Sequence, residues 1–215
     1  MVARTADQIS KLVDDHYDST YPFRARMQED YDLYTLTDYD AGDGYESYTS
    51  NEPRTYADKI VSWLSAAELT IRIPNIEETR ERREMNDAKE KFLIGVLTGA
   101  DERLRRRLQP SLREQIAWFI SLRGWYAGRA LLHKDSEGKT QIDITPWDAM
   151  HTYWCEGEEG LDWACYKIQK TKGEVLSQYG VELEAQDDEL PVDVYDFYDS
   201  EHNIVCTGDR ILKSA

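Results

Sequence analysis

The sequence predicts an α+β protein, with a helical N-terminal half packed on a mostly antiparallel β C-terminal half. Two observations predict this class. Apolar residues recur at helical spacing in most of the first half, and from Trp125 onward they alternate in short runs separated by glycine-rich turns. Helices followed by strands, rather than alternating with them, are typical of α+β folds. Three segments are expected: an acidic helical arm at 1–48, charged helices with a helix–strand corner at 49–123, and a β-rich part at 124–215.

The arm is expected to form two helices. The first covers about 5–18, and the second covers about 24–36 after a break at STYPF, where proline would interrupt the helix. In the second helix Met27, Tyr31 and Tyr34 lie at i, i+4 and i+7, so one face is largely aromatic. The loop that follows is rich in Asp, Gly and Ser, and we expect it at the surface.

Residues 49–74, TSNEPRTYADKIVSWLSAAELTIRIP, predict a helix followed directly by a strand. Ser50 or Asn51 can cap the helix, and Pro53 suits its first turn. ELTIRIP then alternates apolar and polar residues up to Pro74, as a strand does. The helix stripe and the apolar face of the strand are expected to pack on one core. The stripe consists of Tyr56, Ile60, Trp63, Leu64 and Ala67.

Three further helices are expected before residue 124. The first opens on a capping box formed by Asn75 and Glu78, has a charged, solvated first half and ends at Gly99. Asp101 would cap a short basic helix, DERLRRRL. Pro110 would start the third helix, which ends at Gly124. Its apolar stripe is Leu112, Ile116, Phe119 and Ile120.

The C-terminal part predicts antiparallel strands. WYAGRALLHKD and TQIDITPWD form a hairpin around SEGK, and two more strands flank EGEEG. TKGEVLSQYG predicts a short helix ending at Gly180. The last stretch, VDVYDFYDSEHNIVCTGDRILK, predicts another hairpin. Its inward-facing residues are expected to be Tyr195, Phe197 and Val205.

Charge excludes an ordinary DNA-binding module. The formal net charge is −16, and only residues 76–123 lack an acidic excess, so the chain would repel nucleic-acid phosphates. A surface past which DNA slides remains compatible with this charge. No apolar run is long enough to cross a membrane, and the N-terminus has no apolar signal core. The three cysteines lack metal-type spacing and are interpreted as reduced thiols in a cytosolic setting.

No catalytic motif is present, so neither a cofactor nor a metal is expected. The chain has no phosphate-binding glycine loop, no paired zinc-binding histidines and no G-x-S-x-G elbow. A magnesium nuclease built on Asp135, Asp143 and Asp148 stays open as an alternative, because carboxylates on adjacent strands can hold magnesium. The structural interpretation is favoured. Asp135 precedes a turn, Asp143 alternates with isoleucines as a solvent-facing residue would, and no D-x-K pattern completes the site.

The order of these elements resembles the N-terminal half of tailed-bacteriophage portal proteins, across roughly residues 20–210. The resemblance is carried by NEPRTYADKIVSWLSAAELTIRIP after an acidic helical arm, and by the hairpin from Gly128 to Pro146 within LRGWYAGRALLHKDSEGKTQIDITPWD. GLDWACYKIQK and VDVYDFYDSEHNIV follow in the same order. Portal chains continue into a clip, a stem and a crown, so this chain resembles the N-terminal part of a longer portal.

The resemblance implies a wing-type α+β domain of a ring, with a dodecamer expected. Such a ring sits at one capsid vertex of the virion, is assembled in the host cytoplasm, and passes double-stranded DNA without sequence specificity. Its implied partners are further copies of itself, the major capsid protein, a head–tail adaptor and the terminase motor, with no membrane. The motor ATPase is a separate protein in this family, which agrees with the missing phosphate loop.

Candidate subunit-interface residues follow from charge and from the aromatic excess. The basic cluster Arg103, Arg105, Arg106 and Arg107 could meet a neighbour's acidic surface. Tyr31 and Tyr34 are candidates because tyrosine is favoured in protein interfaces. An alternative function is also open: a monomeric acidic adaptor or DNA mimic that binds a basic partner, through an interaction that weakens steeply with salt.

Overall fold

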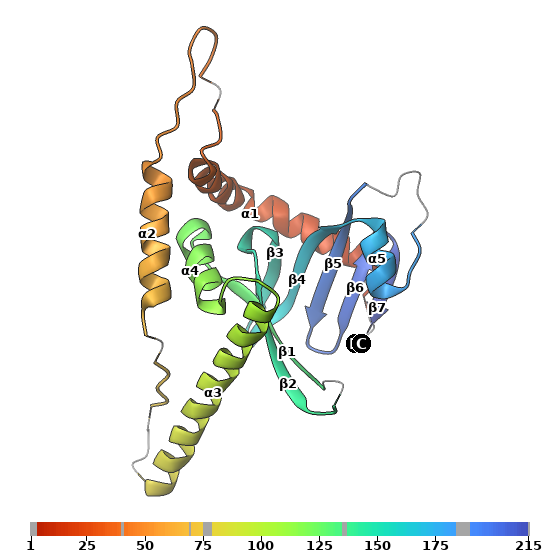
Figure 1. Cartoon of the computed structure of the whole chain (residues 1–215). Coiled ribbons are helices and arrows are strands. Elements are labelled where there is room, and N and C mark those ends of the chain that lie inside the picture. The colour runs from red at the N-terminus through yellow and green to blue at the C-terminus, as the bar shows by residue number, and fades with distance from the viewer. Residues whose placement is uncertain are drawn as a thin grey trace. The chain divides into compact units, whose positions relative to one another are not determined.

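Helices fill much of the first half of the chain, and antiparallel strands dominate the second half, in the computed structural model shown in Figure 1. The predicted α+β class is therefore confirmed. The described residues are 4–39, 41–68, 70–74, 79–134, 137–183 and 190–214. The chain divides into two compact units. Unit 1 comprises Met1–Arg26 and Met150–Ala215, and unit 2 comprises Met27–Ala149.

Unit 1 is built on an antiparallel sheet with strand order β3-β4-β5-β6-β7. Each strand pairs with the next one along the chain, so tight connections suffice except between β4 and β5. The helix α5 (Lys172–Tyr179) lies in that connection, begins with a capping box of Thr171 and Glu174, and ends at Gly180 in the left-handed conformation. The strands are β3 (Thr152–Gly157), β4 (Gly160–Lys170), β5 (Val192–Asp199), β6 (Asn203–Thr207) and β7 (Arg210–Ser214).

Both faces of this sheet are covered, because successive side chains of a strand point to opposite sides. One face packs on Ile9 and Val13 from the first half of α1 (Ala6–Thr35), and Phe197 lies in that cluster. The other face packs on Val175 of α5 through Val205 and its neighbours. The inward positions predicted for the last strands are confirmed: Tyr195, Phe197 and Val205 are all buried.

Unit 2 combines the last turns of α1 with three helices and a hairpin. The helix α4 (Leu112–Arg123) packs against α2 (Glu52–Ala66) and against α3 (Arg80–Arg106). The core joins Leu104 of α3 and Leu112 of α4 to Ile144 of the hairpin. The hairpin is formed by β1 (Ala127–Lys134) and β2 (Thr140–Trp147), and a 3₁₀ turn (Ala149–His151) follows it.

The predicted break in the arm is wrong, since α1 is one continuous helix with Pro22 inside it. Proline removes one backbone hydrogen bond and crowds the preceding turn. Buried side chains lie on both sides of this defect, with Val13 before it and Arg24 and Met27 after it. Tertiary packing within each unit therefore outweighs the local cost of the proline.

The predicted strand of the helix–strand corner is also wrong in the described residues, because 70–74 forms no strand. Ile71 and Ile73 are still less exposed than their neighbours, as the alternating pattern predicts. However, the Ile73 amide donates to Oε1 of Glu90 at 2.7 Å instead of to a neighbouring strand. The capping box predicted at Asn75 and Glu78 lies outside the described residues.

The expected helix end at Gly99 does not occur, and α3 runs through it to Arg106. Asp101 was predicted to cap a separate basic helix. Its carboxylate instead accepts a 2.6 Å hydrogen bond from the Leu112 amide, so it stabilises the start of α4. The end of α4 at Gly124, in the left-handed conformation, is confirmed.

The two units do not coincide with the three segments at 1–48, 49–123 and 124–215. The helix α1 contributes to both units, and the β1–β2 hairpin belongs to unit 2 and not to the β-rich unit. The final stretch forms three strands where a single hairpin was expected. Cys165 and Cys206 are buried and free, and Cys155 is an exposed free thiol.

Candidate interaction surface

The two tyrosines predicted as interface residues lie in aromatic contacts inside unit 2. The ring centroids of Tyr31 and Tyr34 are 6.3 and 6.2 Å from that of Trp118 on α4, in edge-on geometry. The Tyr34 hydroxyl donates a 2.9 Å hydrogen bond to Oδ1 of Asp58 on α2. Burial raises the pKa of Tyr34, and this hydrogen bond raises it further. Tyr34 therefore remains a protonated donor that links α1 to α2.

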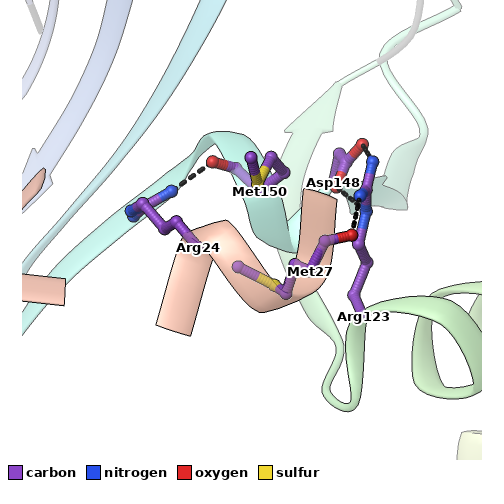
Figure 2. Close-up of polar contacts among 5 residues, drawn as sticks. All are labelled: Arg24, Met27, Arg123, Asp148 and Met150. Atoms are coloured by element: carbon purple, nitrogen blue, oxygen red, sulfur yellow. Dashed lines mark hydrogen bonds and ion pairs between the residues drawn. The ribbon is translucent and has the colours of Figure 1, made fainter. Parts of the chain in front are cut away.

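Arg123 forms a buried anchor that the sequence did not reveal. Its Nε and Nη2 donate to the two carboxylate oxygens of Asp148, each at 3.2 Å, and its Nη1 donates to the Met27 carbonyl at 2.9 Å (Figure 2). The guanidinium carbon also lies 4.8 Å from the centre of the Tyr31 ring. This one side chain joins α4, α1 and the residue after β2 within unit 2.

Arg24 plays the corresponding part in unit 1. Its guanidinium donates to the Met150 carbonyl (Figure 2). It also donates to the Thr152 carbonyl and stacks over Tyr153, 4.2 Å from the ring centre. Arg24 is 2 % exposed, so α1 buries a charged residue directly after the expected break at STYPF. The available sequence signal was weak, because an arginine inside an amphipathic helix is usually solvated.

Of the four arginines predicted as a basic interface cluster, Arg103 serves an internal contact. Its Nε lies 3.3 Å from Oδ1 of Asp143, and its Nη2 donates to the Ile142 carbonyl, which fastens α3 to β2. The expected solvent-facing position of Asp143 is wrong, since its side chain is 17 % exposed. An arginine from a distant helix covers this strand position, and strand alternation alone cannot predict such a contact.

The carboxylates of the alternative nuclease site are engaged with these arginines. Asp143 pairs with Arg103 and Asp148 pairs with Arg123, on different elements of unit 2. Asp135 lies outside the described residues. Across the described ranges, no three His, Cys, Asp or Glu side chains are grouped closely enough to hold a metal ion. Both engaged carboxylates have a structural role in holding helices to the hairpin.

The remaining three arginines, Arg105, Arg106 and Arg107, are exposed at the C-terminal end of α3. Cations at this end are favoured by the helix dipole. The structure gives these side chains no ion pair with any residue that it describes. The following Leu108 is 95 % exposed. We call these three arginines the basic corner.

A groove of about 330 Å³ lies between α1, α2 and α4 in unit 2. Its walls combine aromatic rings with two carboxylates, and we call it the aromatic–acidic groove. The rings come from Tyr34, Trp118 and Phe119, and the carboxylates from Asp58 and Glu114. Sequence analysis missed this site except for Tyr34. Glu114 and Trp118 are separated by one helical turn on α4, but nothing in the sequence indicates that α2 packs beside them.

The apolar stripe predicted to bury α2 is largely exposed, which corrects that expectation. Tyr56 and Trp63 are 68 % and 71 % exposed. The helix packs through Ala57 and Val61 instead, one position along from Tyr56 and Ile60. One residue step rotates the helix face by about 100°. Small residues allow close approach to α4, so the large ones are turned outward.

A second exposed apolar stretch lies on α3. Phe92 is 60 % exposed, and Leu93 and Ile94 are 41 % and 43 % exposed. Consecutive helical residues point in different directions, so this stretch is apolar around much of the helix. Together with the α2 stripe, it gives unit 2 large, exposed apolar side chains on two helices.

Unit 1 carries a cleft of different character, with a volume of about 520 Å³. It lies between the turn joining β3 to β4 and the turn joining β5 to β6. Its described lining is acidic, with Glu159, Asp162, Asp199 and Glu201, and it also includes the cation Arg4. The guanidinium of Arg4 lies over the ring of Phe197 at 5.2 Å.

In the part of the chain that the structure describes, no helix is both long enough and apolar enough to cross a membrane. No protein-family model matches the chain, and a search of curated proteins finds no match either.

Proposed function

We propose that this chain is a structural subunit of a ring, the N-terminal or wing part of a tailed-phage portal, and that it has no catalytic activity of its own. The observation that carries the proposal is the exposure of large apolar side chains on α2 and α3, above all Tyr56, Trp63 and Phe92. Exposed apolar patches of this kind mark association surfaces in soluble proteins. The order of sequence motifs supplies the choice of family.

Heterologous contacts generate rings when the rotation between neighbours closes. Two different apolar helix surfaces on one unit suit such contacts, since each copy can offer one surface to each of its two neighbours. We propose a dodecamer at one capsid vertex of the virion, assembled in the host cytoplasm. The major capsid protein, a head–tail adaptor and the terminase motor are its proposed partners.

Double-stranded DNA is the proposed cargo. The net charge of −16 repels phosphates, so a channel wall of this composition would not hold DNA in place. Packaging and ejection require DNA to slide, and weak, sequence-independent contact favours sliding. The charge therefore supports passage through the ring rather than binding to it.

The test is the mass of the purified 215-residue chain in solution, measured by sedimentation velocity at several concentrations and salt levels, with negative-stain images of the same samples. A closed ring of about a dozen copies of the 25.0 kDa chain is expected. A monomer at every concentration and salt level would contradict the ring.

The acidic adaptor is the second candidate, and the cleft in unit 1 favours it. Four carboxylates around one concavity could receive a basic segment of another protein. An adaptor of this type would be a monomer, and its partner would dissociate as salt is raised. The sedimentation experiment separates the two candidates, because only the portal subunit assembles alone.

A further inference from the structure

We propose that the contact between neighbouring copies inserts Arg105, Arg106 and Arg107 of one copy into the aromatic–acidic groove of the next. The inference rests on the proposed ring and names two of the surfaces that form it. The groove and the arginines both belong to unit 2, and each can be described within that unit.

The groove has the chemistry that a guanidinium group requires. Aromatic faces attract cations, and carboxylates accept hydrogen bonds from the planar guanidinium. Arg54 of the same chain already shows this preference at the edge of the groove. Its guanidinium carbon lies 5.6 Å from the centre of the Tyr34 ring, and its Nε lies 3.9 Å from Oδ2 of Asp58. Glu114 is exposed and has no ion pair with a described residue, so it can accept a further cation.

The arginines are the complementary half of the contact. Three adjacent guanidinium groups repel one another, and a carboxylate-lined surface relieves that repulsion. Arg103, one turn earlier on α3, is already bound to Asp143 and the Ile142 carbonyl. That internal bond fixes the end of the helix on the hairpin, so the three exposed arginines project from an anchored support.

The position of α4 allows the contact to propagate. The groove is lined by residues of α1, α2 and α4 and by Pro110, whereas the arginines lie at the end of α3 and none of the three lines the groove. The donor and acceptor surfaces are therefore different surfaces of one unit. A contact between different surfaces is heterologous, and it can be repeated from copy to copy around a ring.

The first experiment reverses the charge of each side. Arg105→Glu with Arg106→Glu makes the corner acidic, and Asp58→Lys with Glu114→Lys makes the groove basic. Each double variant is expected to raise the concentration for half-assembly about tenfold or more, because like charges then face each other. The chain carrying all four substitutions should assemble near the wild-type concentration, since opposite charges face each other again.

The matched control is Lys11→Glu with Lys213→Glu, which makes the same charge change on exposed positions of unit 1, outside the groove, the arginines and the apolar surfaces of α2 and α3. It should assemble like the wild type. Thermal unfolding of every variant establishes that it is folded, and Asp58→Asn with Glu114→Gln replaces the lysine pair if that pair fails to fold. The inference is overturned if the control is as defective as the arginine variant, or if the fourfold variant is no better than either double variant.

A peptide with the sequence of residues 101–109, DERLRRRLQ, tests the contact independently of assembly. Binding to the wild-type chain should quench tryptophan fluorescence, should weaken as salt is raised, and should be lost in the groove variant. A chain that stays monomeric yet binds the peptide through the groove contradicts the proposed ring and supports the contact. A ring whose assembly ignores all the charge variants supports the proposed function and overturns the inference.

Discussion

At the scale of single residues, the two buried arginines contribute most to the internal order of the units. Arg24 and Arg123 are 2 % and 6 % exposed, and each binds backbone carbonyls from segments far away in sequence. A buried guanidinium is tolerated only when its hydrogen-bonding groups are satisfied. These side chains therefore specify how each unit packs, and substitution should be costly.

Replacing Arg123 by Met should destabilise the chain by about 3 kcal/mol, because the partly buried carboxylate of Asp148 would lose its guanidinium partner. Urea unfolding measures this loss. The double variant Arg123→Met with Asp148→Asn should recover part of it, since the negative charge that Arg123 balanced is then absent as well. Arg105→Met is the control, with an expected change within about 0.5 kcal/mol for an exposed residue. An equal loss in the single and double variants would contradict the assigned role of the pair.

His16 should make the stability of unit 1 depend on pH. Its ring lies 4.6 Å from the Trp154 ring and 5.7 Å from the Tyr153 ring, measured between centroids. Burial lowers the pKa of His16 below 6.5, and the nearby positive charge of Arg24 lowers it further. The unfolded chain therefore takes up a proton more readily than the folded chain as pH falls.

The contribution of His16 to the free energy of unfolding should be fully present above pH 6.5. It should decline below pH 6.5 until the pH reaches the lowered pKa of His16 in the folded chain. The slope for one group is at most about 1.4 kcal/mol per pH unit. Urea midpoints measured from about pH 5 to pH 8 test this, with His16→Gln as the comparison. The two chains should diverge in slope only on the acidic side. Parallel profiles would rule out His16 as the source.

Helical spacing predicted that Met27, Tyr31 and Tyr34 share one face of α1. Met27 is buried, and both tyrosines contact Trp118. This partner could not be predicted, because helical periodicity indicates which residues are inward and not what they meet. The same limit applies to Asp143. Strand alternation placed it outward, and only the position of α3 brings Arg103 over it.

At the scale of elements, local signals predicted starts and ends well where nothing competed with them. Gly124 and Gly180 end helices as expected, and Asn51, one of the two predicted caps, precedes the first residue of α2. The failures are at Pro22 and Gly99, which remain inside long helices. Both residues cost helix stability, but neighbouring turns packed on a core can outweigh that cost.

The glycines of α3 offer a direct test of this argument. A methyl group at Gly95 would meet nothing within 4 Å, and one at Gly99 would lie 3.5 Å from the Arg103 side chain, an ordinary contact. Gly95→Ala and Gly99→Ala should each stabilise the chain by about 0.5–1 kcal/mol in thermal unfolding.

Gly124→Ala is the opposing control for these glycine substitutions. Gly124 has φ of +76°, so alanine there should cost about 1 kcal/mol. Destabilisation by both α3 substitutions would show that the glycines are needed for close packing. Helix continuity through Gly99 would then require a different explanation.

The missing strand at 70–74 illustrates a different limit. The alternation of Ile71 and Ile73 is genuine and is reflected in their lower exposure. A strand also requires a partner, and hydrogen bonding of the Ile73 amide to Glu90 uses a group that pairing would need. Pattern therefore predicted which side chains turn inward but not the hydrogen-bonding state of the backbone.

At the scale of the whole molecule, sequence pattern predicted the α+β class but not the division into units. Counting helices and strands along the chain suggests consecutive segments. The observed units instead depend on contacts between residues more than a hundred positions apart, such as Arg24 with Thr152. The stripe on α2 shows the same limit. It was expected to be inward, and it is turned outward because smaller residues fit against α4.

If the outward stripe is an association surface, its loss should affect assembly and not folding. Tyr56→Ser with Trp63→Ser should change the free energy of unfolding by less than about 1 kcal/mol, because both side chains are mostly exposed. The concentration for half-assembly should rise about tenfold or more, as expected for aromatic anchors of an interface. Sedimentation velocity measures this change.

The loop that precedes α2 supplies a matched control. Tyr45 and Tyr48 are 79 % and 80 % exposed, but they lie outside the apolar helix surfaces. Tyr45→Ser with Tyr48→Ser should leave assembly unchanged. Equal defects in the two pairs would indicate that exposed aromatic side chains act non-specifically, and the stripe would lose its assigned role.

Along the sequence, unit 2 lies between the two segments that form unit 1, and this order has a consequence for synthesis on the ribosome. The first part of α1 carries Ile9 and Val13, whose partners in the sheet are translated only after all of unit 2, Met27–Ala149. At about 5–20 residues per second, this delay is roughly 6–25 s. During that interval unit 2 can complete its core while the apolar face of α1 has no sheet to cover it. The nascent chain should therefore be most prone to chaperone binding at its N-terminal helix, and this susceptibility should end when β6 emerges.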